Sequence, residues 1–169
     1  MTKSAARFSI RPAAADDIPV ILGMIRALAE FEQLSHLVVA NDALLQEALF
    51  GKQPGCECVL GCEDGIPVAF ALFFHNFSTF LGRRGLYLED LYVHPQARGR
   101  GHGKAMLSHL AALAVTRGCG RFEWSVLDWN ADAIGFYQGI GADVMPDWRI
   151  CRVSGDSLAT LAAGASRAG

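Results

Sequence analysis

Hydrophobic and polar residues change their spacing along the first fifty positions. Residues 7–11 alternate and end at a proline, which predicts a short strand. Apolar residues then recur at helical spacing over 18–29, after Asp16 or Asp17 as the N-cap. A second helix is predicted over 41–50, with the Asn-Asp pair as its cap and a glycine as its stop.

The middle of the chain has the pattern of strands. Segments 56–62 and 67–77 flank the turn 63–65, which predicts a β-hairpin. The turn 82–85 then leads into a third strand over 86–93. Three consecutive strands joined by short turns predict an antiparallel arrangement.

A glycine-rich segment separates this region from the last predicted elements. A helix begins inside residues 98–104 and runs to Thr116, and a strand follows over 121–126. Because a helix lies between the strands 86–93 and 121–126, these two strands should be parallel. A short helix over 130–138 and a last strand over 149–153 complete the pattern. We therefore predict an α/β fold with a mixed, mostly antiparallel central sheet and a β-loop-α unit.

Length and composition narrow the function classes. The 169 residues, 51% of them hydrophobic, indicate one domain over 1–169, with a core at about 7–153 and a frayed tail at 159–169. The net charge of −2 argues against broad nucleic-acid binding and against a basic membrane anchor. No apolar run has the length of a membrane span, and no signal peptide is evident, so we expect a cytoplasmic protein.

Three of the five cysteines lie close together, at 56, 58 and 62. This spacing is not that of a zinc ribbon, and no pair of histidines completes a site. Along one strand the three side chains share a face, which indicates small buried apolar residues. We expect no metal in this protein.

The glycine-rich segment has the features of an anion-binding loop. It follows a strand and opens a helix, where free backbone N–H groups and the helix dipole attract phosphate. The P-loop pattern fails at Arg98 and Ala105, and the dinucleotide pattern fails at Lys104 and Met106. The pattern that fits is R-x-x-G-x-G, formed by Arg98, Gly101 and Gly103, although a purely structural glycine loop would have the same composition.

With this motif the sequence resembles the GNAT superfamily of acyl-CoA-dependent N-acyltransferases. The segment Asn130–Tyr137 is similar to the N-x-x-A-x-x-F-Y segment of that family. The resemblance implies acetyl-CoA as the acyl donor and a parallel strand pair that splays apart to admit it. The residues that it implies for cofactor binding are Leu91, Tyr92, Val93, Arg98, Gly99, Arg100, Gly101, His102, Gly103, Lys104, Asn130 and Ala133.

A narrower resemblance concerns the acceptor. Residues 87–90 and 29–32, with Trp129-Asn130, are similar to the diamine (spermidine/spermine) acetyltransferase branch. This similarity implies a small primary amine as substrate and a homodimer. Phe31 stands where the polyamine enzymes of that branch have tyrosine, so a thialysine-like amine is an equal contender. The residues that it implies for substrate binding are Phe31, Glu32, Glu89, Asp90, Glu123, Trp124 and Ser125.

Two residues are candidates for acid–base chemistry. The amine must lose a proton before it attacks, and a carboxylate in an apolar strand is costly unless it faces a cleft or a partner, so Glu89 is the candidate base or orienting group. Strict alternation along that strand would point Asp90 the other way. Tyr137 is, by resemblance, the candidate acid, because a phenol can donate to a departing thiolate. The alternatives are a salt-bridged face for Glu89 and a packed aromatic for Tyr137.

Together these features predict direct acetyl transfer from acetyl-CoA to a small amine in a ternary complex. A protein or peptide N-acetyltransferase of the same fold is one alternative, and a non-catalytic CoA-binding module is another.

Overall fold

The computed structural model describes residues 6–167. The chain divides into two compact units, one ending at Ser125 and the other beginning at Val126, and each is described by itself. The strands of the first unit are β1 (Phe8–Pro12), β2 (Glu57–Glu63), β3 (Ile66–Ser78), β4 (Arg83–Val93) and β5 (Phe122–Trp124). Its α-helices are α1 (Ile18–Phe31), α2 (Asp42–Phe50) and α3 (His102–Thr116).

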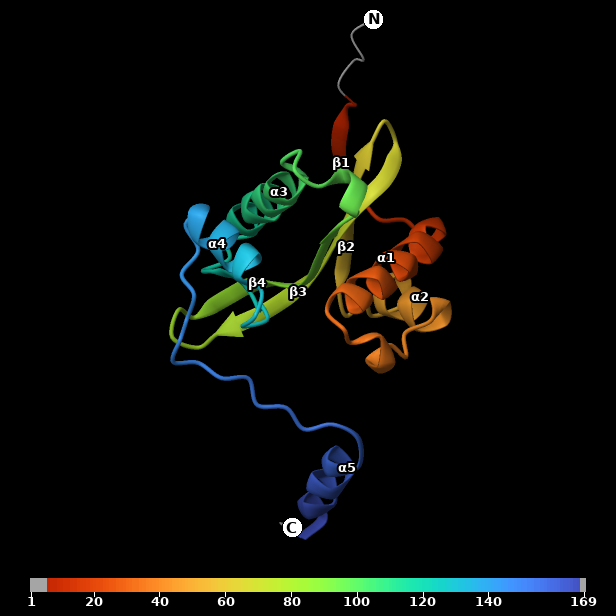
Figure 1. The fold of residues 1–169 in the computed structure, drawn as a ribbon. Coiled ribbons are helices and arrows are strands. Elements are labelled where there is room, and N and C mark those ends of the chain that lie inside the picture. Colours follow the sequence, from red (N-terminus) through yellow and green to blue (C-terminus); the bar gives the residue numbers. More distant parts are fainter. Residues whose placement is uncertain (1–5, 168–169) are drawn as a thin grey trace, which may run out of the picture. The chain divides into compact units, whose positions relative to one another are not determined.

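The strands of the first unit form one sheet in the order β1-β2-β3-β4-β5 (Figure 1). The first four are antiparallel neighbours, and β5 pairs with β4 in parallel. Asp64 and Gly65 join β2 to β3 with positive φ angles of 48° and 85°, as a tight hairpin turn requires. The predicted α/β class, hairpin and parallel pair are confirmed.

Helices cover both faces of this sheet. α1 and α2 lie on one face and α3 lies on the other (Figure 1). On the first face Phe70 and Tyr92, which are opposite each other in register, join a core that includes Ile21 of α1. Fully buried Met106 and Leu110 of α3 contribute to burial on the second face. Each such side chain stabilises the fold by about 1.5–3 kcal/mol relative to an exposed one.

A β-bulge interrupts the pairing of β3 with β4. Phe73 is opposite Leu88 and Leu72 is opposite Asp90, so Glu89 is the extra residue on β4. Residues opposite each other share a face, and Phe73 and Leu72 are on different faces, so Leu88 and Asp90 are as well. The expectation of strict alternation through this strand is therefore wrong, because the bulge exchanges the two faces there.

The parallel pair is short. β4 and β5 are paired only from Leu86 opposite Phe122 to Leu88 opposite Trp124. β4 continues to Val93 without β5 beside it, so the two strands part at the bulge, where a bent strand leaves its neighbour. The splayed strand pair that the sequence predicted is confirmed, and β5 is shorter than the predicted 121–126.

Gly85 is required where the strands of this pair approach a third strand. A Cβ at this position would collide with Oδ1 of Asn76 and lie 3.1 Å from Cγ of Arg121. Asn76 donates from Nδ2 to Glu123 (2.8 Å), and Glu123 also accepts from Nε of Arg121 (2.8 Å). A polar network therefore crosses β3, β4 and β5 over the space that the glycine leaves.

The cysteine cluster lies in the core of the first unit. Cys58 and Cys62 are buried beneath α1 and α2, and Cys56 packs against the same core. Burial raises the pKa of the Cys58 thiol to about 12, and burial together with Glu57 and Glu89 raises the pKa of the Cys56 thiol. The interpretation of these residues as buried apolar side chains is confirmed.

The second unit contains α4 (Ala131–Gly139), α5 (Gly155–Ala163) and a short 3-10 helix, Gly164–Arg167. The predicted helix over 130–138 is confirmed. The predicted strand over 149–153 is wrong, because the alternating residues there have no strand to pair with and remain irregular. Of the tail expected to fray from 159, residues 159–163 belong to α5 and 164–167 to the 3-10 helix, and fraying stays a prediction. Among the described residues, no helix has the length and apolar character needed to cross a membrane.

Candidate active site

The loop between β4 and α3 is shaped by glycine. A 3-10 turn, Pro95–Ala97, follows β4, and Gly99 and Gly101 then take φ angles of 75° and 82°. Residues with a side chain rarely adopt these values, and Gly101 is the N-cap of α3. The two glycines therefore permit the path by which the chain enters the helix.

The first turn of α3 offers free donors. Its first hydrogen bond runs from the Ala105 amide to the Gly101 carbonyl (3.0 Å), so the amides of His102, Gly103 and Lys104 have no acceptor within the helix. A Cβ on Gly103 would find only Cγ2 of Val93, at 4.0 Å. The loop can thus bring several N–H groups close to a phosphate, and it fits the diphosphate of an acyl-CoA.

The Arg98 side chain contacts protein groups on two other elements. Its Nε donates to the Val93 carbonyl (2.9 Å). Its guanidinium carbon lies 5.3 Å from the ring centre of Phe31 and 5.8 Å from that of Tyr92, within the range of cation–π attraction. Arg98 thus connects the loop to the end of α1, where the sequence predicted amine-binding residues.

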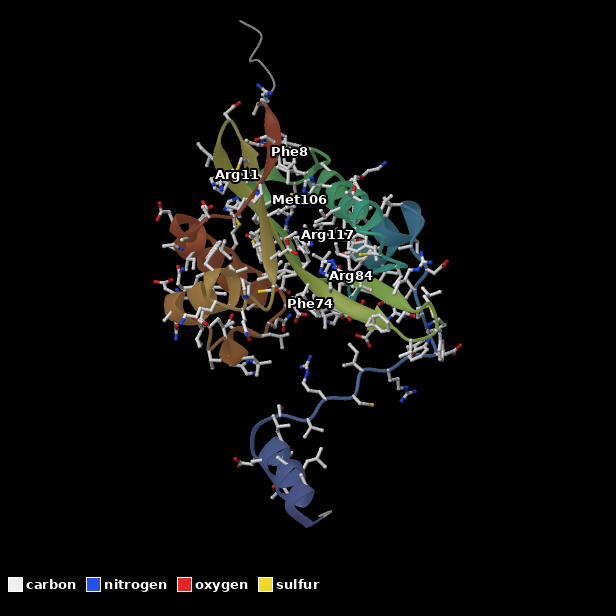
Figure 2. The ribbon with its side chains drawn as sticks, turned by 180° about the vertical axis from the view of Figure 1, so that it is seen from behind. Phe8, Arg11, Phe74, Arg84, Met106 and Arg117 are labelled. Carbon is white, nitrogen blue, oxygen red and sulfur yellow. The ribbon has the colours of Figure 1, made fainter. Side chains whose placement is uncertain are left out.

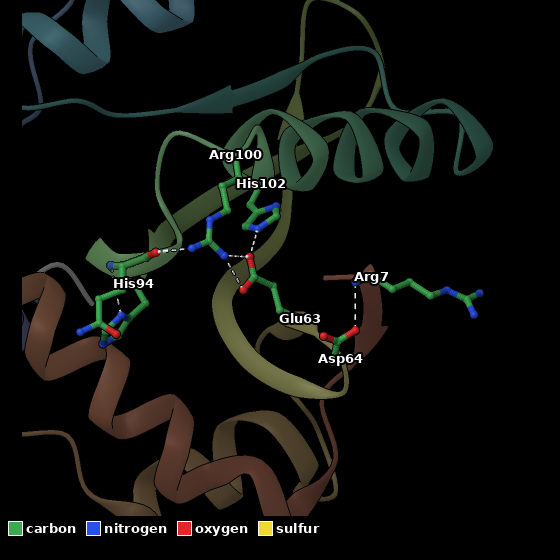
Figure 3. Close-up of polar contacts among 7 residues, drawn as sticks. Arg7, Glu63, Asp64, His94, Arg100 and His102 are labelled. Atoms are coloured by element: carbon green, nitrogen blue, oxygen red, sulfur yellow. Dashed lines mark hydrogen bonds and ion pairs between the residues drawn. The ribbon is translucent and has the colours of Figure 1, made fainter. Parts of the chain in front are cut away.

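The side chains of Arg100 and His102 are both turned to Glu63 at the end of β2 (Figure 3). Arg100 donates from one nitrogen to both carboxylate oxygens at 2.8 Å, and its other nitrogen donates to the Gln96 carbonyl (3.1 Å). His102 Nε2 lies 2.5 Å from Oε1 of Glu63. Both side chains are therefore engaged within the protein, and a role of these two residues toward the cofactor stays a prediction. We call residues 98–104, which link β4 to the first turn of α3, the cofactor loop, after the role predicted for them.

Carboxylates gather at the bulge of β4. Burial raises the pKa of Asp90 to about 6, and the charges of Glu89 and Glu32 add to this rise. Burial also raises the pKa of Glu32, which caps the end of α1. Glu89 is exposed, and its charge also acts on Cys56. The charges of Glu32 and Glu89 therefore both act on Asp90, and we call these three residues the acidic cluster. Asp90 directly precedes the segment of β4 from Leu91 to Val93, which is not paired with β5.

The predicted substrate-binding residues of β5 and Ser125, which follows it, have other partners. Glu123 is held by Asn76 and Arg121, and the Trp124 ring packs on Phe122 with centres 4.9 Å apart. The hydroxyl of Ser125 shares a hydrogen bond of 2.8 Å with that of Tyr87. These contacts order the strand, and a contact with substrate stays a prediction for all three.

In the second unit, α4 and its N-cap carry the other predicted residues. Asn130 caps this helix, with its Oδ1 accepting from the Ala133 amide at 3.2 Å. Phe136 and Tyr137 have ring centres 5.5 Å apart at an angle of 53°. The cap explains why asparagine begins the motif, since its side chain satisfies an amide that the helix leaves free.

Sequence reasoning did not single out Glu63, Phe8 or Asn76. Each acts through a partner far away in the chain: Glu63 through Arg100 and His102, Phe8 through His102, and Asn76 through Glu123. Acidic residues are common just before exposed hairpin turns, so the sequence pattern did not indicate that Glu63 contacts Arg100 and His102. Nowhere between residues 6 and 167 do three His, Cys, Asp or Glu side chains gather as a metal site would need.

Comparison with known families and proteins gives evidence on function that does not depend on the geometry of the site. Residues 15–142 match the model of the acetyltransferase (GNAT) family. The chain is 36% identical to the thialysine N-epsilon-acetyltransferase of Mus musculus over 90% of its length and 96% of the relative's. It is 32% identical to the L-ornithine N5-acetyltransferase NATA1 of Arabidopsis thaliana, over 90% of this chain and 86% of that protein.

Among solved structures, an integron cassette protein from the mobile metagenome of V. cholerae has a similar fold. The TM-score is 0.77 and the identity 26%, over 92% of this chain and 97% of the other. The similarity therefore extends over both units of the chain.

Proposed function

This chain belongs to the GNAT family of acetyltransferases and is an N-acetyltransferase, and from that premise we propose that it moves an acetyl group from acetyl-CoA to the primary amine of a small molecule. The observation that carries the proposal is the acidic cluster of Glu32, Glu89 and Asp90 at the point where β4 leaves β5. An alkyl amine is a cation at neutral pH, with a pKa of about 10.4, and such a cluster attracts it.

The acidic cluster and the relatives both support a particular substrate class. Three carboxylates are more than one ammonium group needs, which favours an acceptor with a second charged group, such as a diamine or a basic amino acid. The two relatives are named for thialysine and ornithine, which both carry two amino groups. We place the substrate of this chain in that class.

Glu89 and Tyr137 take the two proton-transfer roles in this proposal. Glu89 is exposed at the bulge and can take the proton of the bound ammonium, directly or through a water. Asp90 and Glu32 then hold the charge of the substrate. For Tyr137 the support is its place in the motif that begins at Asn130, and its phenol would protonate the departing thiolate.

The cofactor is expected to lie against two parts of the first unit. The diphosphate would accept hydrogen bonds from the free amides at the start of α3, around Gly101 and Gly103. The pantetheine arm of the cofactor would form hydrogen bonds with the backbone of β4 from Leu91 to Val93, where β5 is no longer paired with the strand. Because the amine attacks directly, no acyl group is carried by a side chain.

The test is thiol release from acetyl-CoA with a panel of amines. We expect stimulation by at least one of spermidine, short diamines, lysine, ornithine and thialysine. If CoA binds and only peptide amines stimulate release, the small-amine substrate is wrong and the enzyme acts on proteins. If CoA does not bind, acetyl-CoA as donor is wrong.

A matched pair of variants tests the acidic cluster. Glu32→Gln removes a charge that acts on Asp90, whereas Glu30→Gln removes one from the exposed surface of the same helix. We expect the KM of the amine to rise by about tenfold in the first variant, a loss of about 1.4 kcal/mol, and to stay within about twofold in the second. Equal effects would contradict a role for Glu32 in binding the amine.

We also propose that the enzyme is a cytoplasmic homodimer. Free cysteines at 56, 58, 62, 119 and 151 fit a reducing compartment, and the dimer is implied by the branch that the sequence resembles. Light scattering after size-exclusion chromatography measures the assembly, and a monomer at micromolar concentration would contradict it.

A further inference from the structure

Glu63 is the centre of a contact between the end of β2 and the cofactor loop. Its carboxylate binds Arg100 within the loop and His102 at the first position of α3, which lie 37 and 39 residues away in the chain (Figure 3). The two contacts measure 2.8 Å and 2.5 Å. The histidine and then the arginine hold the pKa of this carboxyl below its usual value.

His102 is fixed from a second side by Phe8. The two rings are stacked, with centres 3.9 Å apart and planes 6° from parallel, and the histidine is buried. Phe8 is opposite Glu63 in the β1–β2 register, so adjacent strands present both contacts. Gly61 leaves room for the phenylalanine ring, since a Cβ there would lie 2.6 Å from it and 3.1 Å from the sulfur of Met106 (Phe8 and Met106 are labelled in Figure 2).

These contacts act on the backbone that receives the diphosphate. Arg100 lies between Gly99 and Gly101, whose positive φ angles shape the loop, and His102 carries the first free amide of α3. Glycine imposes little conformational preference of its own, so a loop of this kind needs external contacts to hold one shape. Glu63 supplies two of them.

We infer that Glu63 is a positioning residue for the cofactor: through Arg100 and His102 it holds the loop and the first turn of α3 in the shape that binds the diphosphate. This inference rests on the proposed use of acetyl-CoA. It assigns to Arg100 and His102 a role in orienting backbone donors, in place of direct side-chain contact with phosphate.

The opposite end of the same strand and helix provides a natural comparison. Glu57 begins β2 and binds Arg117, just after the end of α3, at 2.5 and 2.8 Å. β2 therefore holds α3 at both ends with an acid, but only Glu63 does so beside the loop. A purely structural role would make the two acids equivalent, and a positioning role would not.

The test measures CoA binding by calorimetry, without any amine, together with steady-state kinetics. We expect Glu63→Gln to weaken CoA binding and to raise the KM for acetyl-CoA by about tenfold, with a fall in kcat of less than about twofold. Arg100→Gln should have a similar effect. The double variant should bind CoA no more weakly than Glu63→Gln alone, because that single variant already loses the contact between Glu63 and Arg100.

Two control variants isolate the loop. Glu57→Gln breaks the ion pair at the far end of α3, and Asp64→Asn removes the neighbouring acid, which accepts from the Arg7 amide at 2.9 Å and does not contact the loop (Figure 3). Both should bind CoA within about twofold of the parent protein. If Glu63→Gln does not fold, Arg100→Gln carries the same comparison.

Three outcomes would overturn the inference. One is unchanged CoA binding in Glu63→Gln, and another is tighter binding, which would mean that Glu63 withholds Arg100 from the phosphates. The third is equal weakening in Glu57→Gln, which would mean that general loosening of α3 is the cause. Failure of the parent protein to bind CoA would instead contradict the proposed donor.

Discussion

Asp90 is a partly buried acid that destabilises the folded protein at neutral pH. Its pKa rises from 3.8 to about 6 on folding, first because of burial and then because of Glu89 and Glu32. Between these values the unfolded chain ionises before the folded one, so stability falls as the pH rises through this range. Above pH 6 the cost is about 3 kcal/mol.

Replacement of this acid should therefore stabilise the protein while it weakens function. We expect Asp90→Asn to raise the free energy of unfolding by about 2–3 kcal/mol near pH 7.5 and to change it little near pH 3, where both states are protonated. Urea unfolding at the two pH values measures this, and amine KM is followed in parallel. A gain that does not depend on pH would show that relief of a buried charge is not the cause.

A substitution at Gly103 can distinguish an effect on CoA binding from an effect on stability. Its position in the first turn of α3 leaves space for a methyl group, and alanine favours a helix over glycine by about 1 kcal/mol. We expect Gly103→Ala to fold with equal or greater stability and to bind CoA at least tenfold more weakly, because the new Cβ lies where phosphate approaches. Thermal unfolding and calorimetry measure the two effects.

The matched control is Gly23→Ala in α1, which also has open space around it and lies in another helix. It should gain similar stability without any change in CoA binding. If Gly103→Ala binds CoA normally, the diphosphate does not approach the first turn of α3.

At the scale of elements, local side-chain chemistry made the helices and turns predictable. Asn41 caps α2 by accepting from the Leu44 amide (3.0 Å), and Asn130 caps α4 in the same way. The hairpin turn at 63–65 was predictable from Asp64 and Gly65. Each of these features depends on residues a few positions apart, which a single sequence displays directly.

Features that depend on a distant partner were not predictable. The bulge at Glu89 arises from the register of β4 on β3, and no residue type in β4 indicates it. The segment 149–153 has the alternation of a strand, but a strand forms only where an edge accepts its hydrogen bonds. The site followed the same rule: the glycine motif was visible, and the contact of Glu63 with its loop was not.

A substitution at Gly85 tests the close contact among β3, β4 and β5. We expect Gly85→Ala to destabilise the first unit by about 1–3 kcal/mol, because the methyl group displaces Asn76 from Glu123 in a packed region. Gly55→Ala, at a site with open space, should change the free energy of urea unfolding by less than about 0.5 kcal/mol. If the two variants are equally stable, the polar network is not tightly packed.

At the scale of the whole molecule, the two units differ in how regular they are. Residues 143–153 of the second unit are exposed and form neither helix nor strand, whereas the first unit is held by a continuous sheet. Exposed irregular segments are the preferred sites of proteolysis. The segment contains two trypsin sites, Arg149 and Arg152.

We therefore expect limited trypsin digestion to cut after Arg149 or Arg152 before it cuts anywhere between residues 8 and 125. Mass spectrometry of the early fragments identifies the sites. Early cleavage after Arg117 would contradict this order, and the ion pair of that residue with Glu57 makes it a suitable internal comparison. Resistance of both sites in the second unit would show that another surface covers them.

The strand order of the sheet has a consequence for folding kinetics. Because β2, β3 and β4 are neighbours both in the chain and in the sheet and are joined by short turns, their pairing closes only small loops. β1 pairs with β2 across two intervening helices, and β5 is separated from β4 in the chain by α3. Loop-closure entropy favours the early formation of local contacts. We expect the three-strand meander to form the folding nucleus, with the cofactor loop acquiring its shape late, when Phe8 and Glu63 come together around His102.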